Sequence, residues 1–355
     1  MRTFASRIVA WQRAMGRRDL PWQGVRDPYR VWLSEIMLQQ TQVATVVPYY
    51  LRFVERFPDV VSLAHADSGE VMRLWAGLGY YARARNLHAC ARQVVAQHGG
   101  AFPRSAGKLA DLPGIGRSTA AAIAAFCFDE RAAILDGNVK RVLTRQFGVQ
   151  GDPRRAALER LLWARAESLL PDADAMPAYT QGLMDLGATV CVRSAPRCDD
   201  CPVRSTCVAL RAGRVDELPA ARPRRAPRLR FAHLLLLVHE DRVLLEQRPG
   251  AGIWGGLLSL PQFDRLEEMA QTLTALAPAA RARPLPTRRH AFTHFTLQFT
   301  PHLARIEKPL PIAMEPRMQW LAADAIEGAA LPAPMRTLLL EVMCVAPAAD
   351  AVPAH

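Results

Sequence analysis

The sequence predicts a mainly α-helical domain followed by a smaller α/β domain. A chain of 355 residues is long enough to build two hydrophobic cores. Apolar residues recur at helical spacing through most of the chain up to Val190, whereas strand-like runs begin at Phe231 and Asp241. An Arg- and Pro-rich segment lies between these parts. We therefore expect a helical domain at 1–210, a basic linker at 211–229, an α/β domain at 230–345 and a disordered tail at 346–355.

The composition favours a polyanionic partner. A formal net charge of +12 and an isoelectric point near 10.0 suit nucleic acid. The alternative is a compositional bias toward Arg, because the lysines are limited to Lys108, Lys140 and Lys308. No apolar run approaches the ~20 residues of a membrane span, and the basic N-terminus lacks a signal-peptide core. We expect a monomer in the bacterial cytoplasm, associated with the nucleoid and without a membrane partner.

The segment from Leu112 to Gly116 predicts a tight turn between two helices. Gly114 and Gly116 can adopt backbone angles that other residues avoid. An Ala-rich helix with Ser118 in its first turn follows, so a helix, a hairpin and a second helix would occupy about 105–128. Free N–H groups at the start of the second helix would suit a phosphate. An ordinary loop between packed helices is the alternative.

Two carboxylates stand in unusual surroundings. Glu35 is the lone acid in the apolar run from Val31 to Gln39. Burial there would raise its pKa and suit it to general acid catalysis, whereas a helix-surface Glu is the alternative. Asp136 follows the apolar pair Ile134-Leu135 and opens a turn, so a second carboxylate is delivered at the end of a buried segment.

Four of the seven cysteines are clustered with the spacing C-x6-C-x2-C-x5-C, namely Cys191, Cys198, Cys201 and Cys207. This clustering favours a metal site in a reducing compartment over a disulfide scaffold. Four cysteines can hold zinc or an iron–sulfur cluster, and the number of ligands does not separate the two.

These motifs resemble those of the MutY-type adenine DNA glycosylases, which belong to the helix-hairpin-helix DNA glycosylase superfamily. The string W-L-S-E-I-M-L-Q-Q-T-Q-V around Glu35 is similar to the catalytic helix of that family. The resemblance implies that Glu35 protonates adenine, that Asp136 stabilises the cationic sugar and that Asn138 positions Asp136. It also implies a two-lobed helix-hairpin-helix domain whose cysteine loop holds one [4Fe–4S] cluster per chain.

Position 118 distinguishes the members of this superfamily. Members with lyase activity carry a Lys early in the second hairpin helix, and its amine forms a Schiff base with the sugar. This chain has Ser118 there. The resemblance therefore implies a monofunctional glycosylase, in which water completes the reaction.

The resemblance also assigns contacts with DNA and with the target base. In the motif GYYxRAxNL the first Tyr, here Tyr80, would wedge into the DNA, and Gln40 would match it from the Glu35 helix. The remaining DNA contacts would be Gly114, Gly116, Ser118 and Lys140, with a helix-surface charge as the alternative for Lys140. Trp22, an aromatic expected to be exposed in a Pro-bounded loop, and Gln181 are candidates for an adenine pocket.

The segment from Gly252 to Phe263 resembles the Nudix-like C-terminal domain of the same family. The helix that follows, DRLEEMAQTLTAL, lacks the acidic array that binds Mg²⁺ in true Nudix hydrolases, so we expect recognition without hydrolase activity. A loop that contacts 8-oxoguanine in the family carries Phe-Ser-His. Here it would be Phe292, Thr293 and His294, with Thr in place of the usual Ser; a plain strand is the alternative.

The predicted function is hydrolytic removal of adenine mispaired with 8-oxoguanine or guanine in double-stranded DNA, in base excision repair. One alternative is an endonuclease III-like glycosylase/lyase acting on oxidised pyrimidines, against which Glu35, Ser118 and the additional C-terminal domain all argue. Another is a non-catalytic iron–sulfur protein that binds DNA. The two carboxylates in their motifs argue against that alternative.

Overall fold

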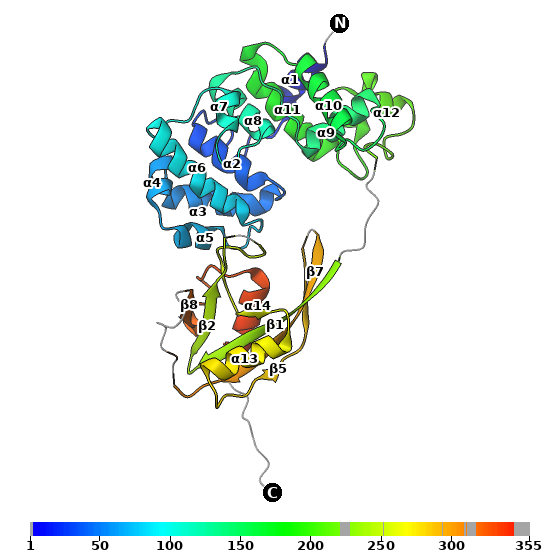
Figure 1. Ribbon diagram of the computed structural model, residues 1–355. Helices are drawn as coiled ribbons and strands as arrows, with labels where there is room; N and C mark the ends of the chain where they lie inside the picture. The colour runs from blue at the N-terminus through cyan, green and yellow to red at the C-terminus, as the bar shows by residue number, and fades with distance from the viewer. Residues whose placement is uncertain are drawn as a thin grey trace. The chain divides into compact units, whose positions relative to one another are not determined.

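The computed structural model describes residues 3–220, 228–250, 252–292, 294–308, 310 and 317–343. The chain divides into two compact units (Figure 1). The first is formed by Met1–His65 and Asn86–Arg224, and the second by Ala66–Arg85 and Arg225–His355. The predicted tail at 346–355 lies outside the described residues.

The first unit is built almost entirely from helices, as the sequence predicts. Its helices are α1 (Phe4–Met15), α2 (Pro28–Leu38), α3 (Val43–Arg56), α4 (Val60–His65), most of α6 (Ala82–His98), α7 (Ala106–Ala110), α8 (Arg117–Phe128), α9 (Gly137–Phe147), α10 (Ala156–Ser168), α11 (Met176–Asp185) and α12 (Val208–Arg211). Among its described residues, no helix is long and apolar enough to cross a membrane, and the same holds for the described part of the second unit.

Helix α8 lies at the centre of the first unit and explains why its sequence is so rich in Ala. The side chains of Ala120–Ala125 are almost completely buried, and α2, α7 and α11 all pack against this helix. Small side chains allow close approach of the neighbouring helices, while Ala also has the highest helix propensity. Packing on α8 brings α2 and α11 together, although about 140 residues separate them in the sequence.

The predicted helix-hairpin-helix is present. Helix α7 is capped by Ser105, whose hydroxyl accepts from the Lys108 N–H, and α8 begins directly after Gly116. Gly114 has a φ of +77°, and a Cβ at this position would come within 2.8 Å of the Asn86 Cβ. Gly is therefore required there by both backbone angle and space. A Cβ on Gly116 would meet open space.

The second unit consists of α5 (Ser68–Trp75), the start of α6 and an α/β part with a mixed sheet. The strands and helices of this part are β1 (Arg228–His239), β2 (Arg242–Gln247), β3 (Leu258–Ser259), β4 (Gln262–Phe263), α13 (Leu266–Leu276), β5 (Arg283–Pro284), β6 (Arg288–Ala291), β7 (Phe295–Arg305), β8 (Met318–Ala322) and α14 (Ala333–Met343). Strands β1 and β7 are parallel, paired from Arg228↔Phe295 to Val238↔Arg305. Helix α13 packs on β1 and closes a core that includes Leu235, Leu237 and Leu273.

Residues 66–85 are held in the second unit by a specific contact. The Arg85 Nη1 donates to the Gly255 carbonyl oxygen at 2.6 Å. Gly255 itself lies so close to the backbone of Gly250 that a Cβ would come within 2.6 Å of its carbonyl oxygen. The segment that carries the start of the GYYxRAxNL motif, up to Arg85, therefore folds with strands that begin about 140 residues later in the chain.

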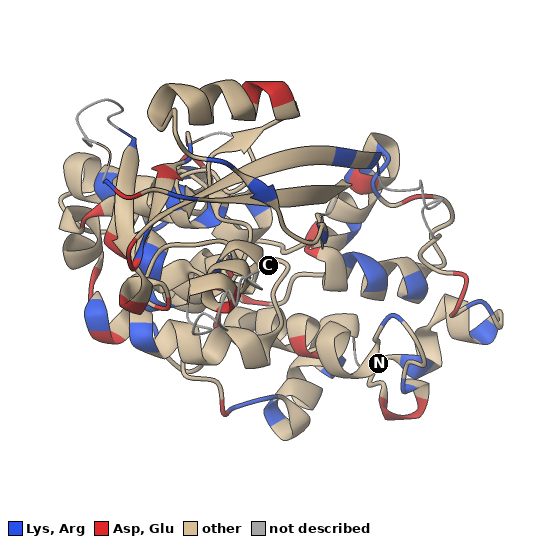
Figure 2. Cartoon of the chain, turned by 90° about the horizontal axis from the view of Figure 1, so that it is seen from below, with Lys and Arg blue, Asp and Glu red and all other residues tan. Residues whose placement is uncertain are grey.

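The segment predicted as a linker, 211–229, has ordered contacts at both of its ends. Leu218 is buried, and its carbonyl oxygen accepts from the Arg145 Nε at 2.8 Å. At the other end, β1 already begins at Arg228. Basic residues are not confined to this segment, because Lys and Arg are spread over helices, strands and turns with acidic residues among them (Figure 2).

Candidate active site

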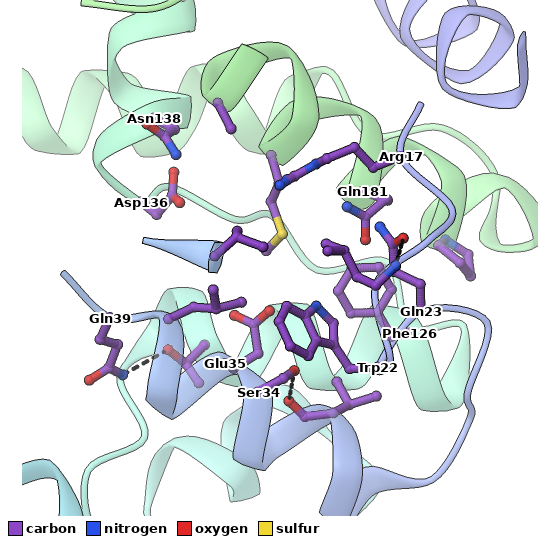
Figure 3. Close-up of a pocket in the computed structure, with 18 of the residues that line it drawn as sticks. Arg17, Trp22, Gln23, Ser34, Glu35, Gln39, Phe126, Asp136, Asn138 and Gln181 are labelled. Atoms are coloured by element: carbon purple, nitrogen blue, oxygen red, sulfur yellow. Dashed lines mark hydrogen bonds between the residues drawn. The ribbon is translucent and has the colours of Figure 1, made fainter. Parts of the chain in front are cut away.

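A pocket of about 1330 Å³ opens in the first unit. Its lining includes seven of the residues singled out in the sequence, namely Trp22, Glu35, Gln40, Ser118, Asp136, Asn138 and Gln181. It is lined by the turn at 20–26, by α2 and the segment 39–44 after it, by residues of α8 and α11, and by the start of α9. Figure 3 shows Glu35, Asp136, Trp22 and Gln181 at this pocket, each from a different segment of the chain. The pocket is large enough to accept one nucleoside.

Glu35 lies near the C-terminal end of α2, three residues before Leu38. Asp27 caps the helix by accepting from the Tyr29 N–H, and Pro28 occupies its first turn. The neighbours Ser34 and Ile36 are buried, whereas the Glu35 side chain faces the pocket. Burial, with a smaller contribution from the nearby Asp136, raises the pKa of Glu35 to about 8. The carboxyl group is therefore protonated at neutral pH and can act as an acid.

Asp136 is held at the N-terminus of α9 with its charge partly compensated. Its Oδ1 accepts from the Val139 N–H at 2.7 Å. Burial raises the pKa of Asp136, but the N–H groups of Val139 and Asn138 and the charges of Arg141 and Lys140 act in the opposite direction. The positive end of the helix dipole also favours an anion here. The ionised form of Asp136 is therefore stabilised by these groups, whereas Glu35 has no such stabilising groups among the described residues.

Asn138 contacts Asp136 through its backbone N–H, and its side chain is held by Arg141. The Asn138 Oδ1 accepts from the Arg141 Nη2 at 2.9 Å. Arg141 also donates to the carbonyl oxygens of Gly187 and Cys191, at 2.6 and 2.8 Å. Sequence reasoning missed Arg141, and an Arg five residues after a motif aspartate gave no signal of its own.

Ser118 carries a hydroxyl where an amine would be needed for a Schiff base. Its Oγ accepts from the Leu135 N–H at 2.9 Å, so it connects the hairpin helix α8 to the strand-like segment that delivers Asp136. Ser118 also lines the pocket.

Trp22 is buried, so the expectation of an exposed aromatic was wrong. Its ring packs edge-on against Tyr50 with centroids 5.1 Å apart, and only 8% of the residue is exposed. The Pro-bounded turn folds this ring onto α3 instead of presenting it to solvent. Trp22 nevertheless lines the pocket, and so does Gln181.

Gln40 and Tyr80 share an unusual backbone conformation. Their φ angles are +58° and +48°, a region that side chains other than Gly rarely adopt. Both side chains are exposed. In the second unit, the Arg83 guanidinium lies 5.4 Å from the centroid of the Tyr80 ring and donates to the carbonyl oxygens of Leu78 and Gly79. Strained, exposed residues of this kind concentrate at functional sites.

Lys140 and the hairpin glycines differ in how accessible they are to a phosphate. The Lys140 ammonium forms an ion pair with Glu159 at 2.5 Å and is only 21% exposed. A phosphate contact by Lys140 would therefore share this cation with Glu159. Gly114 and Gly116 are both exposed, so the turn before α8 is open to a ligand.

The four clustered cysteines are free thiols in a loop of short turns between α11 and α12. Burial, with smaller contributions from the other three thiols, raises the pKa of Cys201 to about 11. Buried Arg145 donates to the Cys191 Sγ at 3.5 Å and to the Val192 carbonyl oxygen at 2.7 Å. Within the described ranges, no group of three or more His, Cys, Asp or Glu side chains is arranged to hold a metal ion.

Phe292 lies in an aromatic cluster of the second unit. Its ring is stacked on Phe295 at 4.7 Å and meets His290 edge-on at 4.7 Å, while Trp254 lies 5.6 Å away. His294 is exposed, and Thr293 lies outside the described residues. Trp254 and His290 were missed, because their contact with Phe292 depends on pairing of distant segments.

Two family models match the chain. The model for the HhH-GPD superfamily of base excision DNA repair proteins matches residues 33–168, and a NUDIX domain model matches residues 232–341. A protein named adenine DNA glycosylase from Buchnera aphidicola (subspecies Baizongia pistaciae) is 34% identical over 96% of both chains. A human protein of the same name is 34% identical over 94% of this chain and 72% of its own length.

Solved structures agree with the helical fold of the first part of the chain. A thermostable thymine-DNA glycosylase matches with a TM-score of 0.53 and 30% identity, over 59% of this chain and 95% of its own. A non-covalent complex of endonuclease III with DNA matches with a TM-score of 0.50 and 20% identity, over 59% of this chain and 94% of its own. The second likeness shows the fold alone.

Proposed function

Because this chain belongs to the adenine DNA glycosylase family of base excision repair enzymes, we propose that it releases adenine paired with 8-oxoguanine or guanine and leaves the strand uncut. It is a DNA-binding hydrolase that cleaves an N-glycosidic bond. The observation that carries the proposal is the pairing of a protonated Glu35 with a charge-supported Asp136 in one pocket, at which position 118 offers a hydroxyl and no amine.

The chemistry follows from the two carboxyl groups. The adenine must leave the base stack to reach the pocket, at a cost of a few kcal/mol. The Glu35 carboxylic acid donates its proton to a ring nitrogen of adenine, the bond from the sugar C1′ to N9 breaks, and the electron pair leaves with the base. Ionised Asp136 stabilises the cationic sugar. Water then attacks C1′ and gives its proton to the Glu35 carboxylate, which restores the acid.

Residues of both units would contact the DNA. The open N–H groups at the start of α8, after Gly114 and Gly116, suit a backbone phosphate. Gln40 and Tyr80 are the side chains proposed to enter the base stack, and their left-handed backbone and exposure support that role. Lys140 would act as a phosphate contact shared with Glu159.

We also infer that Cys191, Cys198, Cys201 and Cys207 hold one [4Fe–4S] cluster. The chemistry of the donors supports this inference, because four free thiols stand in one loop and Arg145 offers a positive charge to the sulfur of Cys191. When bound, the cluster would cross-link this loop and take no part in base release. The cysteines and Arg145 therefore serve to fix the surface that follows α11.

The second unit would recognise the base opposite adenine. The cluster around Phe292 supplies stacking surfaces, and Thr293 and His294 would supply polar groups to 8-oxoguanine. Helix α13 has Glu267 and Glu268 in its first turn, without the wider acidic array of Nudix hydrolases, so we propose no hydrolase activity for this unit. The working location would be the chromosome of a bacterial cell, with the protein acting as a monomer.

Single-turnover cleavage of a duplex containing one A·8-oxoguanine pair tests the proposal. The wild-type protein should yield strand breaks only after alkali. Glu35→Gln should bind the duplex but release no adenine, whereas Glu55→Gln, at an exposed position of α3, should behave as wild type. Breaks without alkali would show a lyase, and no release by protein with its cluster intact would favour a non-catalytic DNA-binding protein.

A further inference from the structure

One buried carboxylate at the edge of the pocket has no role in the chemistry above. Asp185 is the last residue of α11, and none of it is exposed. Its Oδ1 accepts from the Arg17 Nε at 2.7 Å, and its Oδ2 accepts from the Arg17 backbone N–H at 3.1 Å. The Oδ1 also accepts from the Gln181 Nε2 at 2.9 Å. A buried ion pair of this kind is held in one geometry.

The pairing with Asp185 determines which way the Gln181 amide faces. An ionised carboxylate accepts hydrogen bonds and donates none. Only the NH₂ end of the Gln181 amide can therefore face Asp185, and the carbonyl oxygen Oε1 is left for the pocket, which Gln181 lines (Figure 3). This orientation follows from the chemistry of the partner, because a flipped amide would place two acceptor oxygens against each other.

Gln23, which lines the same pocket, has a hydrogen-bond donor there instead of an acceptor. Its Oε1 accepts from the Leu20 N–H at 3.3 Å, and its Nε2 is buried without a partner among the described residues. The pocket thus combines an acceptor on Gln181 with an unused donor on Gln23, beside the rings of Trp22 and Phe126 (Figure 3). A base edge with a donor next to an acceptor complements this pair.

Adenine has such an edge, since its 6-amino group donates and the neighbouring ring nitrogen accepts. Hypoxanthine and guanine carry an oxygen at position 6, which would meet the Gln181 carbonyl as a second acceptor. We propose that Asp185 is a positioning residue that makes the pocket selective for 6-aminopurines, by fixing the amide of Gln181. The inference rests on the proposed adenine release and adds the source of base selectivity.

The test compares bases at the target position, opposite 8-oxoguanine, in single-turnover reactions. Wild type should release adenine faster than hypoxanthine and unsubstituted purine. Asp185→Asn lets the Gln181 amide face either way, so the adenine-to-hypoxanthine rate ratio should fall roughly tenfold, the value of one misplaced hydrogen bond. Asp174→Asn, an exposed carboxylate just before α11, is the matched control and should keep the wild-type ratio.

A double-mutant cycle shows whether Asp185 acts through Gln181. Gln181→Leu should lower the ratio as much as Asp185→Asn, and the double variant should show no further loss. An equal loss of rate on every base would mark Asp185 as merely structural and overturn the inference, as would an unchanged ratio in Gln181→Leu, a variant that leaves the Arg17–Asp185 pair in place. If wild type releases no adenine at all, the proposed function fails instead.

Discussion

Glu35 and Asp136 are the same kind of acid in one pocket, yet they are prepared for different charges. Burial is the main influence on Glu35, and its pKa is raised to about 8. Burial raises the pKa of Asp136 as well, but two backbone N–H groups and two cations favour its ionised form. The side chain whose proton is needed keeps it, and the one whose charge is needed has the compensating donors.

The raised pKa of Glu35 predicts a pH-dependent loss of stability. The folded-state pKa lies above the unfolded value of 4.5, so the favourable contribution of the protonated form is complete below pH 4.5 and is lost as pH rises through about 8. Glu35→Gln removes this dependence. The free energy of unfolding of Glu35→Gln should exceed that of wild type by roughly a few kcal/mol at pH 9. The two values should match near pH 4.

Denaturant unfolding of the two proteins at several pH values measures this difference. Glu55→Gln, at an exposed position, should follow the wild-type curve throughout. Parallel curves for wild type and Glu35→Gln would mean that Glu35 titrates normally in the folded protein.

Sequence alone identified the residues whose surroundings are set locally. Glu35 stands out because its neighbours along the helix are apolar, and Asp136 because it follows a buried run. Asp185 could not be identified this way, since its role depends on Arg17, which comes from the other end of the unit. Trp22 was misjudged for the same reason: a loop position says little about the partner that a ring folds onto.

Among the elements, the hairpin before α8 shows how two neighbouring glycines serve different purposes. Gly114 is confined by a positive φ and by Asn86, whereas Gly116 has an ordinary φ of −83° and open space around it. The motif predicts both glycines but does not separate their roles. The φ angle and the contact with Asn86 separate the two roles.

Replacing each glycine with Ala should therefore give distinct results. Gly114→Ala should lower the free energy of unfolding by about 1 kcal/mol or more, because the new Cβ is strained and meets Asn86. Gly116→Ala should leave stability within about 0.5 kcal/mol of wild type, but weaken binding of duplex DNA, since its methyl group would stand where a phosphate approaches. Thermal unfolding and a DNA titration measure the two effects. Equal stability losses would contradict the assignment.

For the whole molecule, the two units should respond separately to loss of the proposed cluster. Cys201→Ser removes one of four ligands in the first unit, and structural metal sites contribute several kcal/mol to folding. The melting temperature of the first unit should fall by roughly 5–10 °C while that of the second stays constant. Calorimetry and an iron count measure both quantities. Cys127→Ser, a buried thiol outside the loop, should keep its iron; full iron in Cys201→Ser would refute the ligand set.

The division of the chain into units was the hardest property to predict. Motifs such as GYYxRAxNL follow one another along the helical part, so the sequence suggests one boundary at the Arg- and Pro-rich segment. Yet residues 66–85 associate with strands from the C-terminal part, through contacts such as Arg85 with Gly255. A hydrogen bond to a backbone carbonyl leaves no side-chain signal at the distant position.

That association imposes an order on biosynthesis. Residues 66–85 leave the ribosome early, but their partners follow only after about 140 further residues have been added. Gly255 lies 170 residues after Arg85. At about 5–20 residues per second, it is therefore synthesised roughly 9–34 seconds after the turn that carries Tyr80. A nascent chain can therefore complete the core around α8 long before the Tyr80 turn receives its final support. A chain released prematurely would keep Glu35 and Asp136 but lack the partners of the segment that carries Tyr80.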